Sequence, residues 1–152
     1  MLDVAKNEIF TAYSELATNG KDKSKKPATK QRKATLDSLT DTIYEWNYIS
    51  STPTRNELVY RLTKHLNEND LKAKTGCIPS ILVQAKYPIE LVRYHSDRDI
   101  FELLGRMVWI NDQYDCCIGI LAGLDHPEVL SELEETFANI FAEEEGVVLI
   151  LV

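Results

Sequence analysis

The C-terminal stretch 116–152 constrains the fold most strongly, because it has the pattern of a strand, a helix and a second strand. Residues 116–122 and 147–152 are uncharged apolar runs, and such runs are typical of strands that are buried on both faces. Two strands separated by a helix favour a parallel pair joined by a crossover connection. We therefore expect a β-α-β unit to close the domain.

The segment between these two runs has the features of an amphipathic helix. Asp125 is a good N-cap residue, and Pro127 falls in the first turn, where its missing N–H has no cost. Gly146 is a suitable residue for the chain to leave the helix. The apolar residues recur at helical spacing and predict one buried stripe: Val129, Leu130, Leu133, Phe137, Ile140 and Phe141.

The position of the last strand, 147–152, has two interpretations. A run of six apolar residues favours a central strand that is covered on both faces. The alternative is an edge strand that pairs with a second copy of the chain, because an uncharged apolar edge is prone to association unless it is covered. We expect the central position.

The first half of the chain is predicted to be helical. Apolar residues recur at helical spacing in 2–17, 35–49 and 54–66, and residues 54–57 have the pattern of a capping box. Between the first two helices, the segment 21–33 has no apolar periodicity and is expected to be a loop.

The segments that follow are less regular. Residues 67–76 are polar, with a short helix expected at 70–74, whereas 78–85 favours a strand and 88–95 fits a strand or a short helix. A helix is expected to start at Ser96, where Asp99 completes a capping box. Its apolar residues cover a wide face and predict a deeply buried helix: Ile100, Phe101, Leu103, Leu104, Met107 and Val108.

These segments predict an α+β fold with a helical N-terminal half. A small sheet of three or four strands follows, with packed helices, and it includes the C-terminal β-α-β unit. The length of 152 residues suits a single domain, 1–152. Within it we expect a helical subregion, 1–76, which carries the basic loop 21–33, and an α/β subregion, 77–152.

Charge is distributed unevenly along the chain. The segment 21–33 holds seven basic residues and one acid, so its net charge is +6. The whole chain carries −7, and the remainder therefore carries −13. This asymmetry predicts a basic loop that either offsets an acidic body or binds phosphates of a nucleic acid. The loop lacks the aromatic residues that stack on unpaired bases.

A second pattern relevant to nucleic acids lies in 71–86. A helix end, a glycine in the turn and Pro79-Ser80 as a helix start have the order of a helix-turn-helix. The expected recognition helix, 79–86, contains no arginine, and 81–83 fits a strand equally well.

The sequence predicts no catalytic, cofactor-binding or metal-binding residue. Three histidines are far apart in sequence and have no zinc-ligand spacing, and no glycine-rich phosphate loop is present. Cys116 and Cys117 lie in an apolar run, which raises thiol pKa values and favours buried, reduced thiols over an activated nucleophile.

The function expected from these features is that of a non-enzymatic, acidic interaction protein, such as a regulator, adaptor or inhibitor. The partner is expected to be another protein or a second copy of this chain, with a nucleic acid as the alternative through 21–33 and 71–86. Without a signal peptide or an apolar run of membrane-spanning length, we expect a cytoplasmic protein with no membrane partner. The predicted partner-binding residues are Lys21, Lys23, Lys25, Lys26, Lys30, Arg32, Lys33, Glu132, Glu134 and Glu135.

Overall fold

The computed structural model describes residues 32–46, 54–123 and 127–152, all within one compact unit, Arg32–Val152. The helix predicted at 2–17 lies outside the described residues, as does most of the basic segment 21–33. The statements below concern the described residues only.

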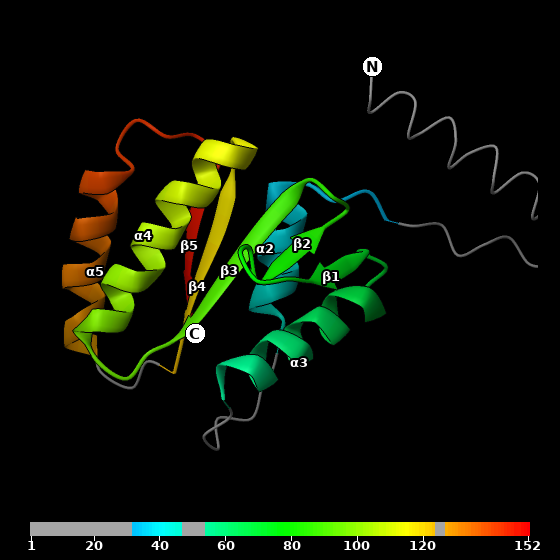
Figure 1. Ribbon diagram of the computed structural model, residues 1–152, viewed down its shortest axis with the longest axis horizontal. Coiled ribbons are helices and arrows are strands. Elements are labelled where there is room, and N and C mark those ends of the chain that lie inside the picture. Colours follow the sequence, from blue (N-terminus) through cyan, green and yellow to red (C-terminus); the bar gives the residue numbers. More distant parts are fainter. Residues whose placement is uncertain (1–31, 47–53, 124–126) are drawn as a thin grey trace, which may run out of the picture. The chain divides into compact units, whose positions relative to one another are not determined.

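These residues form four helices and one five-stranded sheet in an α+β arrangement, as the sequence predicts (Figure 1). The elements in chain order are α2 (Leu36–Tyr44), α3 (Arg55–Glu68), β1 (Ala73–Thr75), β2 (Ile81–Val83), β3 (Tyr87–Arg93), α4 (Asp97–Tyr114), β4 (Cys117–Ala122), α5 (Pro127–Ile140) and β5 (Val147–Leu151).

The strands lie in the sheet in the order in which they occur in the chain, β1-β2-β3-β4-β5. The first three pair in antiparallel fashion, whereas β3, β4 and β5 are parallel and are connected through α4 and α5. The predicted C-terminal β-α-β unit is therefore confirmed.

The sheet separates two hydrophobic clusters. On one face, Ile89, Ile118 and Ile150 pack with residues of α2 and α3, such as Leu39 and Leu62. On the other face, strand residues pack against α4 and α5 in a second cluster: Val92, Cys117, Leu121, Leu103, Met107, Leu133 and Phe141. Helices therefore cover both faces.

Side chains cap the helices at the two capping boxes that the sequence predicts and at one further helix start. The Thr54 hydroxyl accepts a hydrogen bond from the Glu57 amide at 3.2 Å, at the start of α3. At the start of α2, where no cap is predicted, the Thr35 hydroxyl accepts one from the Ser38 amide at 3.0 Å. At the start of α4, the Asp99 carboxylate accepts one from the Ser96 amide at 2.9 Å. Such bonds satisfy backbone donors that have no partner inside the helix.

The strand β4 is the most deeply buried of the five, because all six of its residues are buried. Gly119 lies on β4 opposite Met107 of α4, and a Cβ atom at this glycine would lie 2.1 Å from the Met107 Sδ. The close packing of α4 on the sheet therefore requires a residue without a side chain at this position.

Two strand predictions need correction. The sheet has five strands rather than three or four, and the extra strand, β1, replaces part of the helix expected at 70–74. Leu71 is fully buried, and the Asn67 side chain bonds the backbone N–H and C=O of Ala73, at 2.9 and 3.1 Å. These contacts favour an extended chain over a helical turn. The ambiguous segment 88–95 belongs largely to the strand β3.

The strand β5 is an edge strand, so the predicted central position is wrong. It pairs with β4 on one side only, and four of its five residues are half-buried. The strands β1 and β2 extend the sheet from its opposite side, beyond β3. The apolar run of β5 reflects contact with helices on both faces and leaves its outer edge without a strand partner among the described residues.

The helix-turn-helix expected in 71–86 is absent from the structure. The segment forms β1 and β2, and no helix begins at Pro79. Ile81 and Val83 are fully buried in the sheet, where β2 pairs with strands on both sides. Burial of alternate side chains by the sheet outweighs the helix-start pattern of Pro79-Ser80.

Replacing Gly119 by alanine should destabilise the protein, by about 2 kcal/mol, because the added methyl group overlaps the buried Met107 side chain. Urea unfolding monitored by circular dichroism measures the loss. The double variant G119A/M107V should recover part of it, because the shorter side chain leaves room for the methyl group. Purely additive effects of the two substitutions would contradict this account.

Candidate functional site

The outer face of α4 carries apolar side chains that are left uncovered by the other described elements. Phe101, Val108 and Trp109 are exposed, and the Trp109 side chain is 53% exposed. With Gly105 they occupy positions i, i+4, i+7 and i+8, which form one stripe along a helix. This stripe lies away from the buried stripe of α4, which consists of Ile100, Leu103, Leu104, Met107 and Ile110.

The expectation that α4 is deeply buried is therefore only partly correct. Phe101 and Val108 belong to the single wide face that the sequence predicts to be buried, but the structure exposes both. The apolar face is too wide for one side of a helix to bury. Its width is the feature of the sequence that indicates a second, exposed stripe, and Trp109 completes that stripe.

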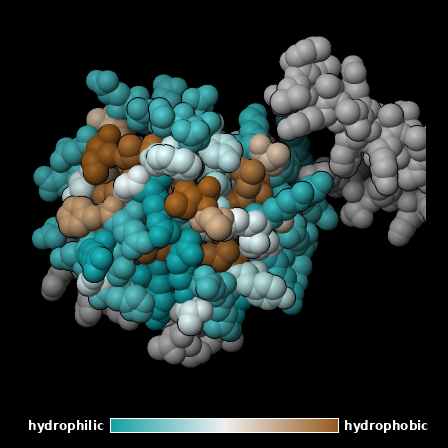
Figure 2. All heavy atoms as spheres, in the orientation of Figure 1, coloured by the Kyte–Doolittle hydropathy of each residue, from teal (hydrophilic) through white to brown (hydrophobic). Residues whose placement is uncertain are grey.

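A groove of about 400 Å³ lies beside this stripe, between the C-terminal parts of α4 and α5. Figure 2 shows hydrophobic surface near the upper end of α5, with hydrophilic surface around it. We call this surface the α4–α5 groove. Its lining residues are Gly105, Val108, Trp109, Asn111, Asp112, Ile140, Phe141 and Glu144.

Acidic residues border the α4–α5 groove. Asp112 and Glu144 belong to its lining, and the exposed Glu143 and Glu145 flank Glu144. The Asn111 side-chain amide donates to the Glu144 carboxylate at 3.2 Å and so connects α4 to the segment after α5. The described lining contains no basic residue, and the rim is therefore negatively charged.

Gly105 lies in the middle of α4 at the groove, where glycine is costly. A glycine in a helix interior costs about 1 kcal/mol relative to alanine. A Cβ atom at Gly105 would have no neighbour within 4 Å, so packing within the described chain does not require the glycine. Its absence of a side chain leaves open space next to Trp109.

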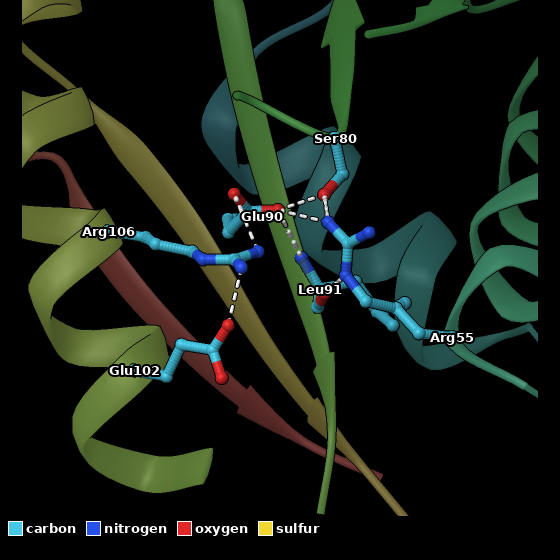
Figure 3. Close-up of polar contacts among 6 residues, drawn as sticks. All are labelled: Arg55, Ser80, Glu90, Leu91, Glu102 and Arg106. Atoms are coloured by element: carbon cyan, nitrogen blue, oxygen red, sulfur yellow. Dashed lines mark hydrogen bonds and ion pairs between the residues drawn. The ribbon is translucent and has the colours of Figure 1, made fainter. Parts of the chain in front are cut away.

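A second group of polar residues surrounds Glu90, a fully buried carboxylate on β3 (Figure 3). The Arg55 Nη2 donates to Glu90 Oε1 at 3.1 Å, and the Ser80 hydroxyl donates to the same oxygen. The Arg106 Nη1 lies 3.7 Å from the other oxygen, Oε2, and Arg106 also pairs with Glu102.

The unequal lengths of β2 and β3 explain this arrangement. The pairing of β2 with β3 ends at Ile89, so Leu91 faces the β2 side with no strand opposite it in the described sheet. The Arg55 Nε donates to the Leu91 carbonyl at 2.9 Å, and the Leu91 amide donates to Glu90 Oε1 at 3.2 Å. The two side chains thus replace the missing strand partner.

The Glu90 cluster is a structural link between layers. Arg55 opens α3 on one face of the sheet, whereas Arg106 belongs to α4 on the other, and both guanidinium groups contact one carboxylate. Burial raises the pKa of Glu90 above its usual value, and the charges of Arg55 and Arg106 oppose this shift. Without exposure, Glu90 has no access to a substrate. Sequence patterns do not indicate this cluster, because its members lie far apart in the chain.

The predicted basic residues are only partly described. Lys21, Lys23, Lys25, Lys26 and Lys30 lie outside the described residues, whereas Arg32 and Lys33 are described and exposed. The Arg32 amide donates to the Asp70 carbonyl at 3.1 Å, and its own carbonyl accepts from the Gln84 side chain at 2.5 Å. Binding of nucleic acid by 21–33 stays a prediction, and 71–86 no longer supports it.

The three predicted acidic residues, Glu132, Glu134 and Glu135, are exposed on α5 but have different surroundings. Glu134 lines a small cavity beside β5, together with Tyr44. The charge of Glu132 acts on Tyr94, whose pKa is raised by desolvation first and by nearby carboxylates in addition. Arg32 contacts residues next to β1 and β2, so it lies near the opposite edge of the sheet from Glu134.

Two of the three thiols and His65 have structural surroundings. Cys116 and Cys117 are buried, whereas Cys77 is exposed. Burial raises the pKa of Cys117 to about 12, and the nearby Glu90 charge adds to this effect. The His65 Nε2 lies 2.8 Å from the Thr42 carbonyl and connects α3 to α2. Among the described residues, no group of three or more His, Cys, Asp or Glu is arranged to hold a metal ion.

No helix among the described residues is both long enough and apolar enough to cross a bilayer.

Replacing Arg55 by methionine should destabilise the protein, by about 3 kcal/mol at pH 7, because the buried Glu90 carboxyl loses a hydrogen-bonded cationic partner. The loss should be smaller at pH 4. With its pKa raised, Glu90 favours the folded state most when it is protonated, and this contribution declines as pH rises through the folded pKa. Removal of Arg55 raises that pKa further. Urea titrations at both pH values measure the difference.

Arg61→Met is the matched control on the same helix. Arg61 pairs with Glu57 at 2.7 Å on the surface, and exposed pairs contribute less than about 1 kcal/mol. Equal losses in the two variants, or a loss for Arg55→Met that does not depend on pH, would contradict the assignment of Glu90 as a structural link.

The three thiols should react at different rates in the native protein. At pH 8, a water-soluble disulfide reagent should modify Cys77 within minutes, whereas Cys116 and Cys117 should react only after urea is added. Burial hinders access to both, and it raises both pKa values. Mass spectrometry of the modified protein identifies the sites, and rapid native reaction of Cys117 would show that the β4 environment is open.

The chain was compared with known proteins by sequence and by structure. No protein-family model matches it, and neither the curated proteins nor the solved structures contain a significant match. Its function is therefore inferred from its own residues.

Proposed function

We propose that this protein acts by binding another protein, and that the α4–α5 groove holds an amphipathic, basic segment of that partner. The observation that carries the proposal is the exposure of Trp109 and Phe101 on a helix that borders a groove of about 400 Å³. Aromatic residues next to a pocket are the residue types that contribute most to protein–protein affinity.

The exposed stripe favours a binding role over a purely structural one. Single exposed apolar residues are ordinary, but a contiguous group bordered by polar residues marks interaction surfaces. Here Val108 and Ile140 extend the surface from α4 to α5. Gly105 supports this interpretation, because its open space lets a partner approach the helix closely at a cost to helix stability.

The acidic rim selects the type of partner. Asp112 and Glu144 would repel the same residues of a second copy, and they would repel an anionic membrane surface. A segment with Lys or Arg on either side of apolar anchors satisfies both the groove and its rim. The partner in this proposal is therefore a protein. The three unpaired cysteines are compatible with a reducing cytoplasm, where free thiols are stable.

A library of random peptides displayed on phage tests the proposal whatever the identity of the partner. Panning on the full chain should enrich peptides with apolar residues at i and i+4 and with flanking Lys or Arg. Titration calorimetry with a synthetic copy of an enriched peptide should show that Trp109→Ala and Phe101→Ala each lower the affinity at least about tenfold.

Tyr60→Ala is the matched control. Tyr60 is 65% exposed but lies on α3, which packs on the other face of the sheet, so its replacement should leave peptide affinity unchanged. Gly105→Leu should weaken binding as well, because its side chain enters the groove. Enriched peptides that bind the Trp109→Ala variant as tightly as the wild type would refute the proposed site.

Gly105→Ala separates stability from binding. It should raise the free energy of unfolding, by about 1 kcal/mol, because alanine favours the helix and meets no neighbour. The same methyl group should weaken the binding of the selected peptide. A variant that is more stable and binds equally well would show that the glycine has no role in the groove.

A further inference from the structure

The outer edge of β5 presents backbone groups that have no partner among the described residues. The Cys117 amide donates to the Gly146 carbonyl, and the Val152 amide donates to the Leu121 carbonyl. Residues 146, 148, 150 and 152 therefore direct their backbone groups at β4. Because these directions alternate along a strand, Val147, Leu149 and Leu151 direct theirs outward.

This edge lacks the features that normally prevent further pairing. Natural edge strands carry charges, prolines or bulges, or they are covered by another element. The stretch 147–152 contains no charge and no proline, and β5 pairs with β4 without a break in register. An extended chain can therefore add to it as a further strand.

A cavity of about 210 Å³ lies directly beside the strand. Leu149 and Leu151 of β5 line it, and so do Tyr44 of α2 and Phe137 of α5, which belong to opposite layers. We call this space the β5 slot. Its lining is apolar and aromatic except for Glu134, so it offers pockets for apolar side chains and one fixed negative charge.

We propose that the β5 slot takes an extended segment of a partner protein, which adds to the sheet as a sixth strand. The segment carries apolar residues that enter the slot and a Lys or Arg that pairs with Glu134. Backbone hydrogen bonds to Val147, Leu149 and Leu151 provide affinity, and the alternate side chains provide specificity. This surface is separate from the α4–α5 groove.

Charge favours this occupant over a second copy of the chain. Two copies that pair through β5 about a two-fold axis are antiparallel, and each would bring its own Glu134 and acidic α5 to the shared edge. Outside 21–33 the chain carries −13, which increases the repulsion. A basic segment meets complementary charge at the same edge.

Two synthetic peptides serve as probes: one alternates valine with lysine, and the other alternates valine with glutamate. Amide hydrogen exchange, followed by NMR on the full chain, reports on each backbone N–H group of β5. The lysine peptide should slow exchange at Val147, Leu149 and Leu151, at least about tenfold at saturation. The glutamate peptide should have no effect.

Backbone methylation of the lysine peptide separates strand addition from charge attraction alone. N-methyl groups on the residues that bond β5 should abolish protection, whereas N-methyl groups on the alternate residues should not. Equal effects of the two methylated peptides would overturn the proposal, because they would show that no strand is added.

Three variants complete the test. Glu134→Lys should reverse the preference to the glutamate peptide, whereas Glu135→Lys, at an exposed position outside the slot lining, should retain the original preference. Leu149→Pro should abolish protection while the protein stays folded by circular dichroism, because this amide faces away from β4. If this variant unfolds, Glu134→Lys and the methylated peptides decide the question.

Other outcomes would overturn the proposal. Protection of β5 that increases with protein concentration alone, together with dimers in sedimentation velocity, would identify a second copy as the occupant. Equal protection by both peptides would rule out charge recognition. Protection by neither peptide would rule out strand addition. Because Trp109 and Leu149 lie on different surfaces, failure of strand addition at the β5 slot would not affect the proposed binding role of the α4–α5 groove.

Discussion

The buried carboxylate of Glu90 is the interaction on which the arrangement of the layers depends. Two guanidinium groups reach it, Arg55 from α3 and Arg106 from α4, and these helices lie on opposite faces of the sheet. They can meet only because β2 ends before β3 does, so that Arg55 passes the open side of β3 at Leu91. The early end of β2 thus gives Arg55 access to Glu90, and Arg55 in turn provides a partner for the buried charge.

The same arrangement determines which parts of the described chain remain available to a partner. With α3 and α4 attached to the sheet through Glu90, both faces are covered, and the open features of the described elements include the outer side of α4 and the outer edge of β5. Each combines apolar residues with nearby carboxylates. The two surfaces therefore favour similar partner chemistry, basic and apolar, but they differ in geometry, because one suits a helix and the other an extended chain.

Local patterns in the sequence predict the elements well but predict their environment poorly. The caps at Thr54 and Ser96, the strand β4 and the helix α5 follow from residue types and spacing within a few positions. The edge position of β5 follows because β1 and β2 join the sheet beyond β3, and β1 is too short and too polar to indicate its presence. Periodicity also merges the two stripes of α4, since it shows which residues are apolar but not how many of them a neighbour can cover.

The candidate sites are less predictable than the fold. The charge of Glu134 makes it a candidate from sequence alone, and the structure places it at the β5 slot. Trp109 and Gly105 escape such reasoning, because a lone tryptophan and a lone glycine in a helix have no distinctive pattern until the neighbouring α5 is in place. Glu90 and its arginines come from three separate elements, and only tertiary structure brings them together.

The strand order β1-β2-β3-β4-β5 has a consequence for how the sheet forms. Each strand pairs only with its neighbours in the sequence, so no pairing has to wait for a distant part of the chain. Loops between sequence neighbours are shorter than those that an interleaved strand order would need, which lowers the entropy cost of closing them. A sheet with this strand order has no built-in closure, and within the described chain β5 ends it without a strand that completes its edge.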